Sequence, residues 1–113
     1  MQKLSLDALA REQLAQARSS SASRSASTVV GGHEHVMRQT LIALAADARL
    51  DDHENPGEAT LQVLSGRVEL TAGADRWEGR RGDLLIIPDA RHGVLALEDS
   101  VVLLTAVPRR HAR

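Results

Sequence analysis

The hydrophobic positions of this chain first follow a helical rhythm. Ser5 precedes this stretch as a candidate N-cap, and Asp7 lies in the first turn, where the helix dipole favours an acidic side chain. The polar face carries both positive and negative residues, unlike a helix that lies on a membrane. We therefore predict a short amphipathic helix over residues 5–18 that packs on the outside of the domain. Its apolar stripe recurs at intervals of three and four: Leu6, Leu9, Ala10, Leu14 and Ala17.

The pattern changes twice after this helix. Residues 19–27 hold six Ser in nine positions, and nothing in them can pack a core, so we predict a linker that is flexible or loosely laid on the surface. From Thr28 onward, short apolar runs alternate with turn signals such as Ser65-Gly66 and Arg81-Gly82-Asp83. We divide the chain into a helix and linker over residues 1–27 and one domain over residues 28–113, which ends in a short basic tail.

Short apolar runs at this spacing are typical of an antiparallel sandwich or barrel, which makes the predicted fold class all-β. Residues 36–48 are rich in alanine and suit a helix by propensity, but the β-branched Val36, Thr40 and Ile42 favour a strand. Trp77 lies in a further hairpin strand; we interpret it as a packing residue, with pocket lining or a subunit interface as alternatives. The predicted strands fall within 36–45, 60–64, 67–71, 84–87, 92–97 and 100–107.

Composition excludes several classes of protein. A chain of 113 residues forms a single domain, and the absence of cysteine removes disulfides and thiolate metal sites. No apolar run approaches the ~20 residues of a membrane span, and the charged N-terminus does not match a secretory signal. Residues 38–107 hold seven Arg against twelve Asp and Glu, the reverse of a phosphate-binding surface, and Trp77 is the only aromatic residue. We expect a cytoplasmic protein that binds neither nucleic acid nor membrane.

Two segments carry a family resemblance. HENPGEATLQVLSG, over residues 53–66, resembles the first signature of the cupin superfamily, and GDLLIIPDARH, over residues 82–92, resembles the second. The order and separation of the two segments are those of the superfamily, and the resemblance covers residues 38–107. It implies a small single-domain cupin of the conserved-barrel (cupin 2) type. The implied fold is a double-stranded β-helix, a jelly-roll-like barrel with a pocket inside, preceded here by the N-terminal helix.

The resemblance also implies a metal site, which this chain matches only in part. Cupin barrels hold the metal with two His and a Glu from the first motif and a His from the second. His53 matches the first of these ligands and His92 the last. Asn55 stands where the second His is expected and Ala59 where the Glu is expected. Because an amide oxygen is a weak ligand and alanine has no donor, the first metal motif is degenerate.

Strand alternation decides which neighbouring side chains face the barrel interior. Ala59, Leu61 and Val63 are expected to face in, and Glu58 is expected to face out. A bulge at Pro56-Gly57 would shift this phase by one residue and turn Glu58 toward the pocket.

Three functions remain open at this point. The first is a small-molecule-binding protein with weak or no catalysis, whose pocket is lined by His53, Asn55, Ala59, Leu61, Val63 and His92. The alternative is a metal-dependent enzyme, such as a dioxygenase or isomerase. In that case His53, His92 and Glu58 would hold divalent iron, manganese, nickel, copper or zinc, whereas the first function needs no metal. The third is a sensor or scaffold that acts through dimerisation.

Two further features bear on the site and on assembly. His33 and His35 form a second His-x-His behind Gly31-Gly32, which we interpret as an exposed polar turn. Alternatively, this loop crosses the barrel mouth and supplies ligands that the main motif lacks. We also expect a homodimer, because a barrel this small buries limited area alone, and the N-terminal helix can pack on either subunit.

Overall fold

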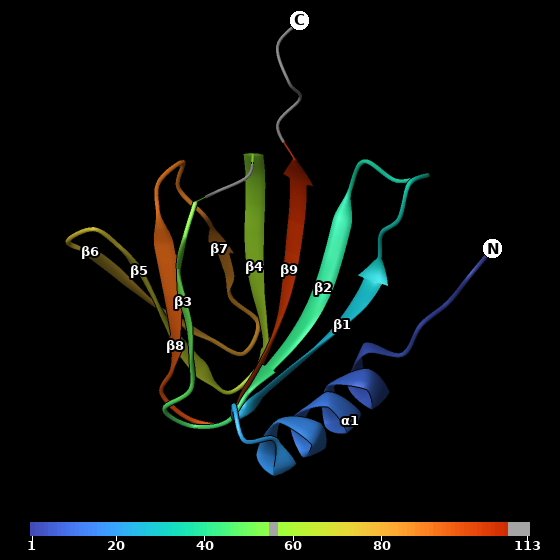
Figure 1. The fold of residues 1–113 in the computed structure, drawn as a ribbon, viewed down its shortest axis with the longest axis horizontal. Helices are drawn as coiled ribbons and strands as arrows, with labels where there is room; N and C mark the ends of the chain where they lie inside the picture. Colours follow the sequence, from blue (N-terminus) through green and yellow to red (C-terminus); the bar gives the residue numbers. More distant parts are fainter. Residues whose placement is uncertain (55–56, 109–113) are drawn as a thin grey trace, which may run out of the picture.

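The computed structural model describes residues 1–54 and 57–108, which form two antiparallel sheets and one helix (Figure 1). The larger sheet has the strand order β1-β2-β9-β4-β7 and the smaller one β3-β8-β5-β6. The prediction of an all-β fold preceded by one helix is confirmed. In chain order the elements are α1 (Leu6–Ser19), β1 (Arg24–Val30), β2 (Arg38–Leu44), β3 (Arg49–His53), β4 (Gly57–Ser65), β5 (Arg67–Ala72), β6 (Asp75–Arg80), β7 (Leu84–Ile86), β8 (His92–Ala96) and β9 (Ser100–Pro108).

Helix α1 forms where the apolar stripe predicts it. The Ser5 side chain accepts a hydrogen bond from the Ala8 amide at 3.2 Å, which caps the first turn. The apolar stripe covers the outer face of the larger sheet, and Arg18 in the last turn pairs with Asp99 at 2.8 Å. A second, smaller core therefore lies outside the barrel, with Ala17, Leu41, Ala43, Val101 and Leu103 buried in it and Leu6, Leu9, Ala10 and Leu14 packed against them.

The predicted serine-rich linker is shorter than expected, because strand β1 begins inside it at Arg24. Residues 24–28 pair in continuous register with residues 40–44 of β2, which supplies backbone hydrogen-bond partners that a free linker would lack. The small side chains also suit this position: Ser25 lies half-buried beneath α1 and its hydroxyl donates to Gln13. The prediction of a flexible segment over residues 24–27 is therefore wrong, although residues 20–23 do connect the helix to the strand.

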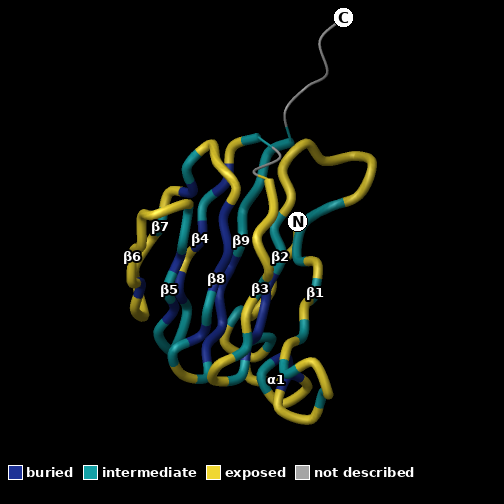
Figure 2. Tube along the Cα trace, turned by 60° about the vertical axis from the view of Figure 1, so that its left-hand side comes forward, coloured by how far each residue is buried: buried dark blue, intermediate teal, exposed yellow. Residues whose placement is uncertain are grey.

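The main core lies between the two sheets and is aliphatic throughout. Along β4, Ala59, Leu61 and Val63 are buried, whereas Glu58 and Gln62 are exposed, as strand alternation predicts. Figure 2 shows the same contrast between strands, with β8 largely buried and β3 largely exposed. The buried residues of this core are Ile42, Leu44, Ala59, Leu61, Val63, Val68, Leu70, Ile87, Val94, Ala96 and Val102.

The two edge strands of the smaller sheet, β3 and β6, were not equally predictable from the sequence. Residues 49–53 form β3, which no predicted run covered, because Leu50 is the only apolar residue in it. Trp77 lies in β6, the hairpin strand that the sequence predicted, directly opposite Leu70 on β5. Its side chain is 41% exposed at the sheet edge, so it packs only partly.

Candidate functional site

One end of the barrel, the upper end in Figure 1, brings together the ends of strands from both sheets. The pairing places His53 of β3 opposite His92 of β8 in the smaller sheet. In the larger sheet, Ala106 of β9 lies between Arg38 of β2 and Ala59 of β4. The sites that the two cupin-like segments predicted therefore do meet in space at this open end.

A bulge in β3 aims His53 at its partner. Leu50 pairs with Val94 and His53 pairs with His92, so three steps along β3 match two steps along β8. Without the extra residue, His53 would face away from the side on which Leu50 packs. The sequence suggested a bulge at Pro56-Gly57 that would re-aim Glu58. Pro56 lies outside the described residues, and Glu58 is exposed. The bulge in β3 lies earlier in the chain and re-aims a histidine.

Gly93 of β8 and Arg91, which lies just before that strand, fit this bulge. A Cβ on Gly93 would lie 2.3 Å from Asp52 Oδ1 and 3.1 Å from the Leu50 carbonyl oxygen, so a side chain there would collide with the bulged strand. Arg91 donates to the Asp52 carbonyl oxygen at 3.1 Å and lies 3.7 Å from the Glu54 carboxylate. The two strands are thus fastened together beside the histidine pair.

The imidazole rings of His53 and His92 are in contact, with centroids 4.4 Å apart and planes inclined by 58°. His92 is only 2% exposed, whereas His53 is open to solvent. His53 Nδ1 lies 3.0 Å from the Asp51 carbonyl oxygen, and His92 Nδ1 lies 3.1 Å from that of Ala90. Because a carbonyl oxygen can only accept, each Nδ1 acts as the donor in these contacts, and each Nε2 is not used by them.

The other predicted site residues occupy different surroundings. Ala59 is 8% exposed below the histidine end, and Leu61 and Val63 lie deeper, packed in the core. Glu58 is exposed on the opposite face of β4, and Asn55 lies outside the described residues. Within residues 1–54 and 57–108, no group of three His, Asp or Glu side chains is arranged to hold a metal ion.

A second feature of the open end is a cavity of about 600 Å³ that the sequence did not predict. His33 and His35 do lie in an exposed loop, as expected, and this loop covers one side of the cavity. Arg38 was not singled out, because an arginine at the start of an apolar run looks like ordinary surface charge. The lining residues are Thr28, Gly31, Gly32, His33, His35, Arg38 and Thr40.

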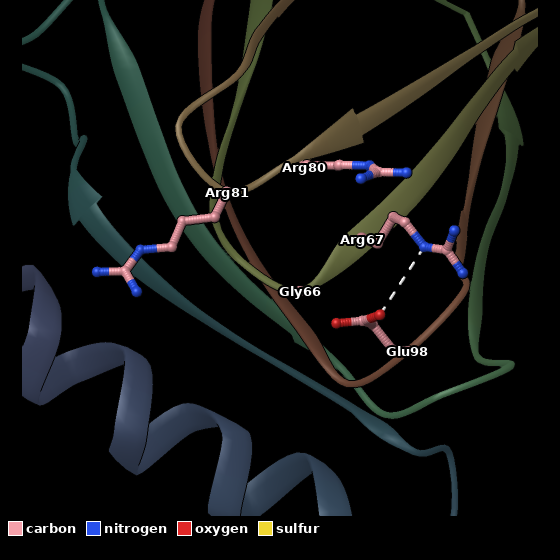
Figure 3. Close-up of a pocket in the computed structure, with 5 residues that line it drawn as sticks. All are labelled: Gly66, Arg67, Arg80, Arg81 and Glu98. Carbon is pink, nitrogen blue, oxygen red and sulfur yellow. Dashed lines mark ion pairs between the residues drawn. The ribbon is translucent and has the colours of Figure 1, made fainter.

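The opposite end of the barrel, which we call the closed end, also has a cavity lined by arginines, of about 490 Å³ (Figure 3). Here the guanidinium groups face carboxylates of the same chain. Arg67 lies 3.0 Å from Glu78 and its Nε lies 3.8 Å from Glu98, while Arg80 lies 3.8 Å from Glu78. Arg81 also borders the cavity, but its side chain points away from the others. The arrangement joins the β5–β6 hairpin to the β8–β9 turn and pairs Arg67 and Arg80 with carboxylates, although among the described residues Arg67 Nε is buried without a hydrogen-bond partner.

Comparison with known proteins identifies the fold. No protein-family model and no curated protein matches the chain. Among solved structures, a conserved protein of unknown function from Streptococcus pyogenes is 22% identical with a TM-score of 0.70, over 81% of this chain and 80% of that one. A cupin superfamily protein from Desulfitobacterium hafniense is 14% identical with a TM-score of 0.70, over 76% and 78%. A cupin 2 conserved barrel domain protein from Salinispora arenicola is 17% identical with a TM-score of 0.67, over 93% and 87%.

The chain therefore has the fold of a small cupin barrel, and the resemblance seen in its two sequence segments is confirmed at the level of the fold. Identities this low leave the ligand and the chemistry to be argued from the site itself. Across residues 1–54 and 57–108, no helix combines the length and the apolar character needed to cross a membrane.

Proposed function

We propose that this protein binds a small molecule at the open end of its barrel, in contact with His53 and His92. The observation that carries the proposal is the pair of touching rings whose Nδ1 atoms are held by backbone carbonyl oxygens. This anchoring fixes both ring orientations and leaves two Nε2 atoms to recognise a bound molecule. A buried histidine whose remaining nitrogen has no further role would be an unusual choice in an aliphatic core.

The surroundings of the histidines support the same proposal. Ala59 and Ala106 are small side chains that pair with each other in the larger sheet near the barrel mouth, and Ala59 stands where a cupin with a full metal motif carries a glutamate. Ligand sites commonly combine an apolar wall with a few fixed polar groups, and the open end offers this combination.

The test is a screen of fragment-sized compounds followed by proton–nitrogen NMR of the imidazole side chains. We expect binding compounds to move the Nε2 signals of His53 and His92, and His92→Ala to weaken that binding about tenfold. Arg49→Ala is the matched control, because Arg49 is an exposed residue on the same strand as His53. The proposal is wrong if no compound moves the imidazole signals of His53 or His92, or if neither His53→Ala nor His92→Ala weakens binding of the compounds that do.

A metal-dependent enzyme is the second candidate, and one observation favours it. Histidines that bind a metal through Nε2 commonly donate Nδ1–H to a carbonyl oxygen, as both histidines do here. The donor set among the described residues nevertheless does not fit a complete site, because catalytic metals usually take three protein ligands. Glu58 faces the other side of β4, and Ala59 has no donor. We therefore derive no reaction step through a metal.

Elemental analysis of protein purified without a polyhistidine tag separates the two candidates. If the metal enzyme is correct, one equivalent of metal should be present and should be lost in both His53→Ala and His92→Ala. Glu58→Ala is informative beside them, since loss of metal in that variant would mean that its carboxylate turns toward the barrel. Protein that stays free of metal after incubation with iron, manganese, nickel, copper and zinc salts would remove the metal enzyme from consideration.

A further inference from the structure

The cavity beneath the loop of residues 31–37 has a chemical character that narrows the ligand. We propose that it binds the carboxylate group of a small organic acid, with Arg38 as the principal anchor. This inference rests on the proposed function, because it names the class of molecule that the open end of the barrel takes. It adds a second recognition point on the larger sheet, on other strands than those that carry the histidine pair.

Arg38 belongs to the interior face of its strand. It pairs with Ala106 on β9. It also lies on the same face of β2 as Thr40 and Ile42, and Ile42 is buried in the main core. Its side chain therefore starts from the inner rim of the barrel rather than from the face that α1 covers. Arg38 is exposed there and lines the cavity.

Within residues 1–54 and 57–108, Arg38 forms no ion pair with a carboxylate. Each arginine in the ion pairs of the described residues is another one: Arg18, Arg67, Arg76, Arg80 or Arg91. A guanidinium group presents its donors in a planar fork that matches a carboxylate with two parallel hydrogen bonds. An arginine on the inner rim of a cavity, without an internal partner, is therefore suited to an anion from solution.

The remaining lining residues supply hydrogen-bond donors and no negative charge. Thr28 and Thr40 lie directly opposite each other on β1 and β2, which places two hydroxyl groups side by side on the wall. His33 and His35 provide ring nitrogens from the loop above. A carboxylate is purely an acceptor and can take several hydrogen bonds, so it complements this set better than a neutral amide does.

The loop that closes the cavity is held near its wall by two glycines. A Cβ on Gly31 would lie 2.9 Å from the Thr28 methyl group, so a larger residue would push the loop away from the wall. Gly32 has φ +98°, a conformation that favours glycine, and its carbonyl oxygen accepts from the His35 amide at 3.3 Å. This turn brings His33 and His35 to the same cavity.

The cavity at the opposite end of the barrel shows that an arginine in the lining does not by itself make an anion site. An anion entering that cavity would compete with Glu78 and Glu98 for Arg67. The cavity at the open end has no acidic residue among those that line it. Its volume of about 600 Å³ falls within the range of small-molecule sites, so it can hold more than the carboxylate itself.

The experiment titrates the full chain with succinate and, in parallel, with succinamide, the neutral diamide of the same shape. Side-chain NMR of the histidines reports where each probe binds, and calorimetry gives the dissociation constant. We expect succinate to bind at least about tenfold more tightly than succinamide, with shifts at His33 and His35. Arg38→Ala should weaken succinate binding about tenfold or more, and Arg38→Lys should restore only part of it.

Two further variants keep the test specific. Thr40→Val preserves the shape of the wall while removing one hydroxyl group, and should weaken succinate binding about threefold. Arg80→Ala removes an arginine from the other cavity and should leave binding unchanged. The proposal is overturned if succinate does not bind, if both probes bind equally, or if Arg80→Ala rather than Arg38→Ala weakens binding.

The same data separate this inference from the proposed function. If succinate moves the signals of His53 and His92 and its dissociation constant is unchanged in Arg38→Ala, the barrel mouth binds a ligand and the anion site is wrong. If succinate binding needs Arg38 and the fragment screen still finds no response at His53 or His92, the anion site stands and the role proposed for the histidine pair is wrong.

Discussion

The two ends of this barrel use similar residues for different purposes. At the closed end, Arg67 and Ser100 are hydrogen-bonded: the Ser100 hydroxyl oxygen accepts from the Arg67 amide at 3.0 Å and lies 2.7 Å from the Glu98 carbonyl oxygen. The arginines there face glutamates of the same chain. At the open end, Arg38 lines the cavity and takes part in none of the ion pairs among the described residues, and His53 and His92 hold backbone carbonyl oxygens through Nδ1 only. The comparison teaches that residue type alone does not mark a site, whereas an arginine that lines a cavity without a carboxylate partner does.

The largest effect should come from filling the closed end at Gly66. Its φ is +81°, and an added Cβ would lie 2.3 Å from both the Asp99 carbonyl oxygen and Ser100 Oγ. Gly66→Ala should therefore lower the free energy of unfolding by about 3 kcal/mol, through backbone strain and overpacking together. Urea denaturation measures the change. Gly73→Ala is the matched control, because Gly73 has φ +61° but open space around it, and should cost only about 1 kcal/mol. Equal losses in the two variants would contradict the close packing of this end.

The next effect concerns the polar centre of the same end. Ser100→Ala removes a fully buried hydroxyl and leaves the Arg67 amide without its partner. The free energy of unfolding should fall by about 2 kcal/mol, since an unsatisfied buried donor keeps its desolvation penalty. Thermal and urea denaturation report the loss, and binding at the open end should persist in the folded variant. A variant as stable as the parent would show that the hydroxyl is dispensable.

At the open end, Gly93→Ala should change the position of the His53 ring more than it changes the free energy of unfolding. The added Cβ meets the Asp52 carboxylate oxygen, which belongs to an exposed side chain that can move, so a cost of about 1 kcal/mol is expected. The displaced bulge should carry His53 away from His92. Nuclear Overhauser contacts between the two rings measure this, and rings that stay in contact would mean that the bulge does not aim His53.

The smallest effect is a dependence of the closed end on acid. The hydrogen bond from the Ala46 amide, followed by that from Arg18, lowers the pKa of Asp99 below its usual value near 3.8. A lowered pKa in the folded state stabilises the protein above the unfolded pKa, and this contribution is lost as the pH falls through the folded value. Because the side chain is about one third exposed, the contribution should stay below about 1 kcal/mol.

Denaturation of wild type and Asp99→Asn as a function of pH isolates this contribution. Between neutral pH and about pH 4 the wild type should be the more stable of the two, and the difference should shrink in stronger acid. A difference that grows as the pH falls would reverse the assigned sign.

Much of the fold was predictable because its core strands are short aliphatic runs, either alternating as in β4 or continuous as in β2 and β9. The runs that became β2, β4, β5, β8 and β9 carry aliphatic residues and end at turn signals. The first residues of strand β1 were not predicted to form a strand, because Ser and Ala contribute little to a hydrophobic pattern. Its place in the sheet depends on pairing with β2 and on cover from α1, neither of which is written in its own composition.

The candidate site was predictable only in part. His53 and His92 were found through the spacing of two motifs, and the structure brings them together. The bulge that turns His53 inward depends on the register between β3 and β8, which no local pattern fixes. Arg38 was missed because its role depends on a cavity with no acidic lining residue, which the sequence around Arg38 does not reveal. A closer look at alternation with Thr40 and Ile42 would have placed it on the inner face.

The order of strands in the larger sheet has a consequence for synthesis on the ribosome. Strand β2 needs β9 as its second neighbour, and Gln39 meets Thr105 across 66 residues of sequence, while Arg18 meets Asp99 across 81. The helix and the first two strands must therefore wait for β9 to emerge before their sheet can close, and contacts this distant form slowly. A nascent segment that waits with an open edge is prone to wrong pairing. The edge that stays unpaired in this interval belongs to β2, because β1 already pairs with the other side of that strand.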